Sequence, residues 1–271
     1  MGTVILACRT IKKEVEAAYE RCGCAHELIW VDSGLHSFPE KLNVQLQGIL
    51  DSLDTYYRHD SDDATNRTSF QSCATDASFQ SCATDASNRS SAADASNQSN
   101  VANNKCVDRV LMTFGVCGNS ILGLKTGNFE LILPKVDDCI TLILGSYDIR
   151  KAAMEESPTY FLTESWLAHE SGIWNEYLHC LKKYGQEDTD AMFKTMLANY
   201  ERFGVIDTGC YDFEHFYRIV SEIANVFNLE VARFKGTTSY IEKLLTGPWT
   251  EDRFRIFPPN NAITFDLLAE T

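Results

Sequence analysis

Three cysteines occupy the same kind of position in this chain, because each stands at or just beyond the end of a short apolar run. The runs cover residues 4–7, 110–114 and 131–133, and the cysteines that follow them are Cys8, Cys117 and Cys139. Apolar runs of this length predict buried strands. In open α/β sheets, ligands bind beyond the carboxyl ends of the strands. The spacing therefore predicts one shared site with three thiols.

Thiolates are strong ligands for soft metals, and three of them suit two kinds of centre. They leave open the fourth position of zinc or one iron of a four-iron cluster, and an open position is typical of a catalytic site. We therefore expect zinc or an iron–sulfur cluster at Cys8, Cys117 and Cys139. Gly118 and Asn119 form a polar turn that lets the backbone approach a ligand closely, so we expect them to contact the cofactor. Core packing of buried cysteines and reactive-thiol chemistry stay open as alternatives.

Two further residues are candidates for catalysis beside the thiols. His36 follows a predicted strand end, where it could serve as an acid, a base or a ligand; a turn histidine is the alternative. Asp138 precedes Cys139, where it could orient a ligand or move protons, and an ordinary helix cap is the alternative. Cys210 lies near another predicted turn and is a candidate fourth ligand. The cysteine pair that flanks Gly23 falls at a helix end, on the opposite edge from the strand tips.

Strands and helices alternate along the chain around these residues. Residues 4–8 and 27–31 predict strands, and residues 11–19 predict a helix with an apolar face and its charges outside. Further strands are predicted at 110–114, 131–133, 204–207, 229–234 and 253–257, the last as an edge strand before two prolines. We expect an α/β fold of mostly parallel sheets, built from three βαβ-like units with flanking helices. The expected parts are a first α/β unit (1–57), an insert (58–105), a central α/β unit with two cysteine motifs (106–150), a helical region (151–203) and a C-terminal α/β unit (204–271).

The expected insert carries a tandem repeat. Residues 69–77 recur letter for letter at 78–86, and weaker copies follow up to residue 104. The repeat is rich in Ser, Ala, Asn and Asp and nearly lacks aliphatic side chains, so it cannot offset the entropy of ordering the chain. We predict a disordered segment whose two cysteines, Cys73 and Cys82, arose by duplication.

Composition excludes several classes of function. The formal net charge of −14 and the pI near 4.8 give no basic footprint for nucleic acid. No apolar run reaches the roughly 18 residues that span a bilayer, and the first residues lead directly into a predicted strand without a signal-peptide pattern. We expect a cytoplasmic protein with no membrane partner. Its ten cysteines then favour metal binding or thiol chemistry over disulfides.

The two central cysteine motifs, FGVCGN at 114–119 and DDCITLILGS at 137–146, together with GLHSFPE at 34–40, resemble those of the DUF1638 family. YFLT at 160–163, Trp166 and the turn DTG at 207–209 agree with that resemblance. The resemblance implies Cys8, Cys117, Cys139 and His36 as signature positions. It also implies an anaerobic archaeal or bacterial setting, often beside genes of corrinoid-dependent methyl transfer. The long insert departs from the family pattern and falls between elements.

Together these expectations describe a metal- or iron–sulfur-binding protein. It would be an enzyme, such as a metal-dependent transferase, or an accessory factor of anaerobic one-carbon metabolism, with a small-molecule substrate or a corrinoid protein as partner. One alternative is a non-catalytic module that holds a cofactor or a protein partner. The other is a thiol-based transferase or redox protein.

Overall fold

Eight strands form two sheets in the computed structural model, which describes residues 2–32, 34, 38–59 and 107–269. The first sheet has the order β2-β1-β3-β4-β8, and the second has the order β5-β6-β7. The strands of the first sheet are β1 (Gly2–Cys8), β2 (Glu27–Val31), β3 (Val107–Met112), β4 (Glu130–Pro134) and β8 (Phe254–Phe257). Those of the second are β5 (Thr159–Leu162), β6 (Arg202–Asp207) and β7 (Glu230–Lys235). His36 and nearly all of the predicted insert lie outside the described residues.

The predicted α/β architecture with mostly parallel strands is confirmed. All pairs in both sheets are parallel except β4 with β8, which is antiparallel and places β8 at the edge, as expected from the sequence. The third predicted unit does not join the first two in one sheet. Its strands β6 and β7 pair with β5, which lies within the range 151–203, and the chain then returns to the first sheet as β8.

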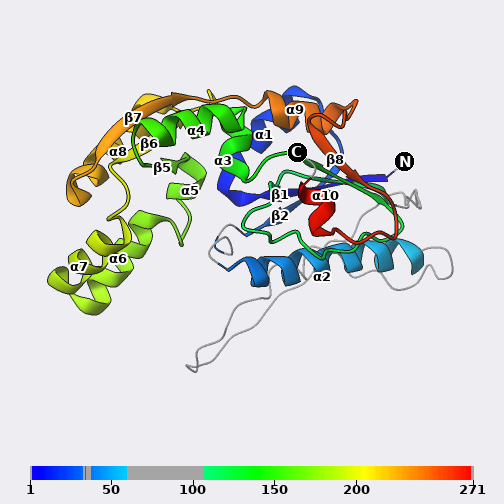
Figure 1. Cartoon of the computed structure of the whole chain (residues 1–271), viewed down its shortest axis with the longest axis horizontal. Helices are drawn as coiled ribbons and strands as arrows, with labels where there is room; N and C mark the ends of the chain where they lie inside the picture. Colours follow the sequence, from blue (N-terminus) through cyan, green and yellow to red (C-terminus); the bar gives the residue numbers. More distant parts are fainter. Residues whose placement is uncertain (1, 33, 35–37, 60–106, 270–271) are drawn as a thin grey trace, which may run out of the picture.

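Helices cover both faces of the first sheet (Figure 1). On one face lies α2 (Pro39–His59), whose buried stripe consists of Leu42, Leu46, Leu50 and Leu53, the spacing expected of an amphipathic helix. On the other lie α1 (Lys12–Arg21), α3 (Cys139–Leu144) and α9 (Ser239–Thr246). A 3₁₀ turn, η1 (Arg9–Ile11), joins β1 to α1. The remaining helices are α4 (Tyr147–Glu156), α5 (Glu164–Leu167), α6 (Ile173–Tyr184), α7 (Gln186–Met196), α8 (Phe213–Phe227) and α10 (Phe265–Ala269).

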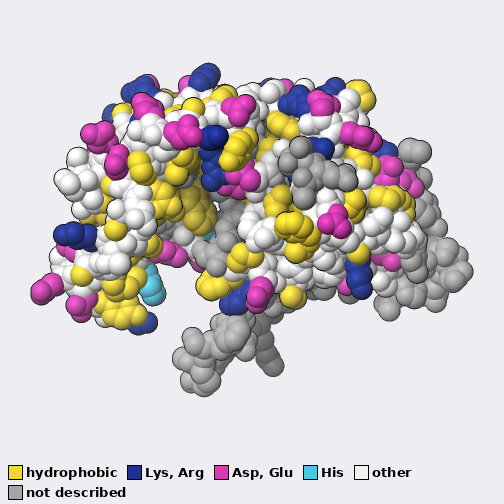
Figure 2. Space-filling view, viewed as in Figure 1, with side chains coloured by type: hydrophobic (Ala, Val, Ile, Leu, Met, Phe, Trp, Pro, Cys, Tyr) yellow, Lys and Arg dark blue, Asp and Glu magenta, His cyan; other side chains and the backbone are white. Residues whose placement is uncertain are grey.

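The buried side chains separate into two clusters, one for each sheet. We call the first sheet with α1, α2, α3, α9 and α10 the first lobe, and the second sheet with α5 to α8 the second lobe. Phe161 and Ile206 of the second sheet belong to the cluster of the first lobe, so apolar contact continues across the junction. Figure 2 shows the surface hollowed between the lobes. Among the described residues, none of the helices has the length and apolar character that crossing a bilayer requires.

The carboxyl ends of the second sheet face the segment that follows β1. Thr163, just after β5, donates its hydroxyl hydrogen to the carbonyl oxygen of Thr10 at 2.6 Å. Thr208, just after β6, donates to the Glu14 carboxylate at 3.0 Å. The edge formed by the carboxyl ends of the strands therefore faces the lobe junction in both sheets. Ligands of α/β proteins bind at this edge.

Candidate functional site

Cys8 is the last residue of β1 and is fully buried. Its backbone N–H donates to the Thr113 hydroxyl at 3.3 Å, and the backbone N–H of Thr113 donates to Leu6 at 2.9 Å. These bonds continue the pairing of β1 with β3 past the end of β3. The sheet itself thereby fixes the position of the first thiol.

Cys117 lies on a tight loop after β3. Cys117, Gly118 and Asn119 have φ angles of 45°, 66° and 68°, a run of three left-handed residues that is costly for the two that are not glycine. The backbone N–H of Cys117 donates to Asp137 at 2.7 Å, which joins this loop to the loop after β4. A Cβ on Gly115 would lie 2.5 Å from the backbone nitrogen of Asp138, so only glycine permits this contact.

Cys139 is the first residue of α3, and the helix is capped by the residue before it. The Asp138 carboxylate accepts the backbone N–H of Thr141 at 2.9 Å, as expected of an N-cap. Arg150 of α4 lies 2.7 Å from the other Asp138 oxygen and 2.5 Å from Asp137. The cap alternative for Asp138 is therefore confirmed, and its carboxylate is held by two partners; its role in catalysis stays a prediction.

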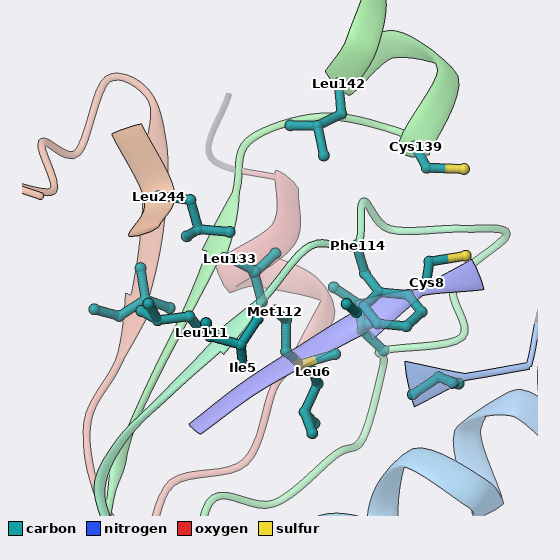
Figure 3. Packing of buried hydrophobic residues seen from close by; sticks show 14 of the residues in the cluster. Ile5, Leu6, Cys8, Leu111, Met112, Phe114, Leu133, Cys139, Leu142 and Leu244 are labelled. Atoms are coloured by element: carbon teal, nitrogen blue, oxygen red, sulfur yellow. The ribbon is translucent and has the colours of Figure 1, made fainter. Parts of the chain in front are cut away.

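The three cysteines lie at the carboxyl edge of the first sheet, where the Cys8 thiol is near Cys139. The pKa of Cys139 is raised well above the usual value, first by a hydrogen bond with the Cys8 thiol, then by burial and by the nearby Cys8 and Cys117. β1, β3 and β4 are neighbours in the sheet, so three separate stretches of sequence supply these groups. Figure 3 shows Cys8 at the end of β1 and Cys139 at the start of α3, beside the apolar cluster around Phe114.

The chemistry of the donor set fits a soft metal, although the side chains do not stand in coordination geometry. Among the described residues, no three His, Cys, Asp or Glu side chains converge closely enough to hold a metal ion as they are placed. A fully buried thiol at Cys8, with Cys117 7% and Cys139 4% exposed, gives a water-poor environment. Gly118 and Asn119 are exposed at the mouth of the loop, and Pro39 at the start of α2 lies nearest to Gly118.

The remaining cysteine candidates lie elsewhere. The Cys210 sulfur accepts a hydrogen bond from Arg21 at 3.4 Å. Arg21 ends α1, whereas Cys8 precedes its start, and ten helical residues span about 15 Å. This contact lies toward the far end of α1, and the role of Cys210 as a fourth ligand stays a prediction. Cys22 contacts the backbone of Glu242 in α9. It precedes β2 and so lies at the sheet edge opposite to Cys8, as predicted.

One contact between the lobes was missed by sequence reasoning. Asp32 follows β2 directly, and its Oδ1 lies 3.2 Å from Nε2 of His169 in the second lobe. The backbone N–H of Ser171 donates to Nδ1 of the same ring, so in the neutral imidazole Nε2 carries the hydrogen and donates to Asp32. Val31 pairs with Cys8, so Asp32 lies at the same sheet edge, one strand away. No local signal marks a histidine far along the chain as its partner.

A second missed residue is Glu14. The charges of α1 were expected outside, but Glu14 is fully buried at the lobe junction, and that prediction is wrong for this residue. Thr208 donates to Oε1, while Oε2 has no hydrogen-bond partner among the described residues. Burial raises the pKa of Glu14 despite the hydrogen bonds that lower it. The nearby Tyr211 also has a raised pKa, from burial first and then from Glu14.

Comparison with known proteins gives a family and nothing more. Neither a curated protein nor a solved structure shows a significant match. A model of a protein family of unknown function, DUF1638, matches residues 95–245, which include Cys117, Cys139 and the carboxyl ends of β5 to β7 but not Cys8. The match covers more than half of the 271 residues, and the chain belongs to the DUF1638 family.

Proposed function

We propose that Cys8, Cys117 and Cys139 bind a zinc ion or an iron–sulfur cluster through three thiolates. The support is one observation: Cys8, Cys117 and Cys139 follow three neighbouring strands at the same edge of the first sheet, and the backbone N–H of Cys117 donates to Asp137 in the loop that leads into Cys139. Like-charged thiolates at such a point repel each other, and a bound cation removes that repulsion. Coordination would require the three side chains to move from their present placement.

The residues around the thiols supply the support that a metal centre needs. Asp138 is held by the helix cap and by Arg150, and Gly115 locks the Cys117 loop against the Asp137–Asp138 backbone. Fixed neighbours keep ligands in place and tune the metal. A metal held by three thiolates keeps one position for substrate, where it would act as a Lewis acid.

The test is metal analysis of protein purified without oxygen. The protein is loaded separately with Zn²⁺ and with ferrous iron plus sulfide, and the bound metal and the visible absorption are measured. We expect about one zinc, or about four irons, per chain. Binding must release the tightly held thiol protons, so the apparent affinity should rise with pH.

Cysteine variants separate this site from adventitious binding. Cys117→Ser and Cys139→Ser should lose most of the metal, whereas Cys210→Ser, which changes a thiol bonded to Arg21, should retain it. Equal metal content in all three variants would refute the proposal.

The reaction class has less support. A metal-dependent transfer of a small thiol-linked or methyl-linked group in corrinoid-linked one-carbon metabolism is supported by the family resemblance and by the open coordination position. Methylcobalamin is the probe: the acceptor thiolate would take the methyl group, and the cobalt–carbon bond would break with its electron pair left on cobalt, which changes the absorption of the corrinoid. Metal-loaded protein should give this change in the presence of an acceptor thiol, and the Cys117→Ser variant should not. An unchanged absorption with both the wild type and the Cys117→Ser variant would refute this reaction without refuting the metal site.

A second function, thiol–disulfide chemistry, is supported by the proximity of Cys8 to Cys139, whose pKa the Cys8 thiol raises. A small disulfide such as oxidised glutathione could convert the two thiols to a protein disulfide, with two molecules of reduced glutathione released. Mass spectrometry after oxidation distinguishes the functions. A reversible Cys8–Cys139 disulfide in protein that binds no metal would favour the redox function.

A further inference from the structure

A pocket of about 310 Å³ lies at the lobe junction, directly beside the residue that follows Cys8. Both lobes line it. The first lobe contributes Arg9, Lys12 and Lys13, and the second contributes Glu164, Ser165 and His169. The Cα atoms of Arg9 and Cys8 are consecutive and so about 3.8 Å apart. We call this space the Arg9 pocket.

The Arg9 pocket is less acidic than the chain as a whole. Three cationic side chains and two carboxylates, those of Glu16 and Glu164, line it, and the Asp32 carboxylate lies 3.2 Å from the lining His169. Cations and carboxylates are therefore balanced here on a protein of net charge −14. Such a pocket repels an anion less than the rest of the surface does.

The cations differ in how far they are already paired. Lys13 is bonded to Glu164, and Lys12 lies 3.5 Å from Glu16. Among the described residues, the exposed Arg9 guanidinium makes neither an ion pair nor a hydrogen bond. Its fork of donors matches an oxyanion in two places at once.

Polar groups that could complete the recognition stand on the second lobe. The Ser165 hydroxyl oxygen accepts the backbone N–H of Lys13 at 3.2 Å, which leaves its own hydrogen to donate. The ring of His169 is held by Ser171, by Asp32 and by stacking on Trp166. An anion that bridges Arg9 and Ser165 would contact both lobes.

We propose that the Arg9 pocket binds the oxyanion group of a small organic acid, with Arg9 as its main contact. A carboxylate could accept the fork of donors on Arg9 and the hydroxyl hydrogen of Ser165 together. Anion binding at this pocket does not require the proposed metal.

The experiment measures protection of Arg9 from phenylglyoxal, which modifies guanidinium groups, in full-length metal-free protein. Mass spectrometry follows Arg9 and, as an internal control, the exposed Arg218 of α8. Propionate should slow modification of Arg9 but not of Arg218, and propionamide, its neutral analogue, should slow neither. Inorganic phosphate is the second probe, and stronger protection by phosphate would assign the oxyanion to a phosphate ester.

Charge variants test the mechanism without removing Arg9. Lys12→Gln should raise the propionate concentration that gives half-protection, and Glu164→Gln should lower it, each by up to about fivefold for partly exposed charges. Equal protection of Arg9 by propionate, propionamide and chloride would overturn the proposal. So would a half-protection concentration of propionate that is the same in Lys12→Gln, Glu164→Gln and the wild type. Arg9 protection in protein that never binds metal would instead refute the proposed function alone.

Discussion

Glu14 provides the sharpest test of the fold at the lobe junction. Its carboxyl is fully buried, one oxygen accepts a hydrogen bond from Thr208, and the other has no partner among the described residues. Substitution by glutamine keeps the Oε1 acceptor and the shape but removes the ability to ionise. Glu14→Gln therefore isolates the cost of a buried charge at this junction.

The sign of the pH dependence follows from the raised pKa. The folded pKa lies above the ordinary value of 4.5, so the stabilisation from this group is complete below about pH 4.5 and is lost as pH rises through the folded pKa. Each unit of difference between the two pKa values is about 1.4 kcal/mol. Relative to Glu14→Gln, the free energy of unfolding of the wild type should fall by up to about 1.4 kcal/mol per pH unit between pH 4.5 and the folded pKa. Above the folded pKa the difference should stay constant.

The assay is urea unfolding followed by the fluorescence of the four tryptophans, from pH 4.5 to 8. Glu20→Gln, an exposed change on the same helix, is the control and should give a curve parallel to that of the wild type. Thermal unfolding gives a second readout, at about 2–4 °C per kcal/mol for a chain of this size. Parallel curves for Glu14→Gln and wild type would show that Glu14 is not buried, and would refute the packing of α1 against the end of β6.

Two further predictions concern the loops around the thiols. Gly115→Ala places a Cβ 2.5 Å from the backbone nitrogen of Asp138, so it should lower both the metal affinity and the thermal unfolding midpoint. The control is Gly48→Ala, where a Cβ meets no atom within 4 Å; this change should stabilise α2 by about 0.5–1 kcal/mol. Unchanged metal affinity in Gly115→Ala, measured by titration, would mean that the loop contact does not position Cys117. Asp32→Asn weakens the bond to His169, so hydrogen exchange at residues 169–171 should quicken; exchange as slow as in the wild type would show that this bond does not hold the lobes together.

The sequence determined those features that local patterns encode. Short apolar runs that end at glycine and aspartate predicted the strands and placed Cys8, Cys117 and Cys139 at their carboxyl ends, because strand length, turn chemistry and helix capping act within a few residues. The cap at Asp138 could be predicted for the same reason. Parallel pairing then brings such ends to one edge, and the interaction of Cys139 with Cys8 agrees with that expectation.

The contacts between the lobes depend on tertiary packing that no local pattern encodes. Glu14 stands among the charges of α1 and looks in sequence like any solvated residue, yet the end of β6 covers it. The pairing of Asp32 with His169 and the contribution of both lobes to the Arg9 pocket are likewise contacts between segments far apart in the chain. Sequence periodicity indicates which face of a helix or strand is apolar. It does not indicate which distant segment will pack against the polar residues of that helix. For Glu14 that segment is the end of β6, and this packing sets the burial and the pKa of the carboxyl group.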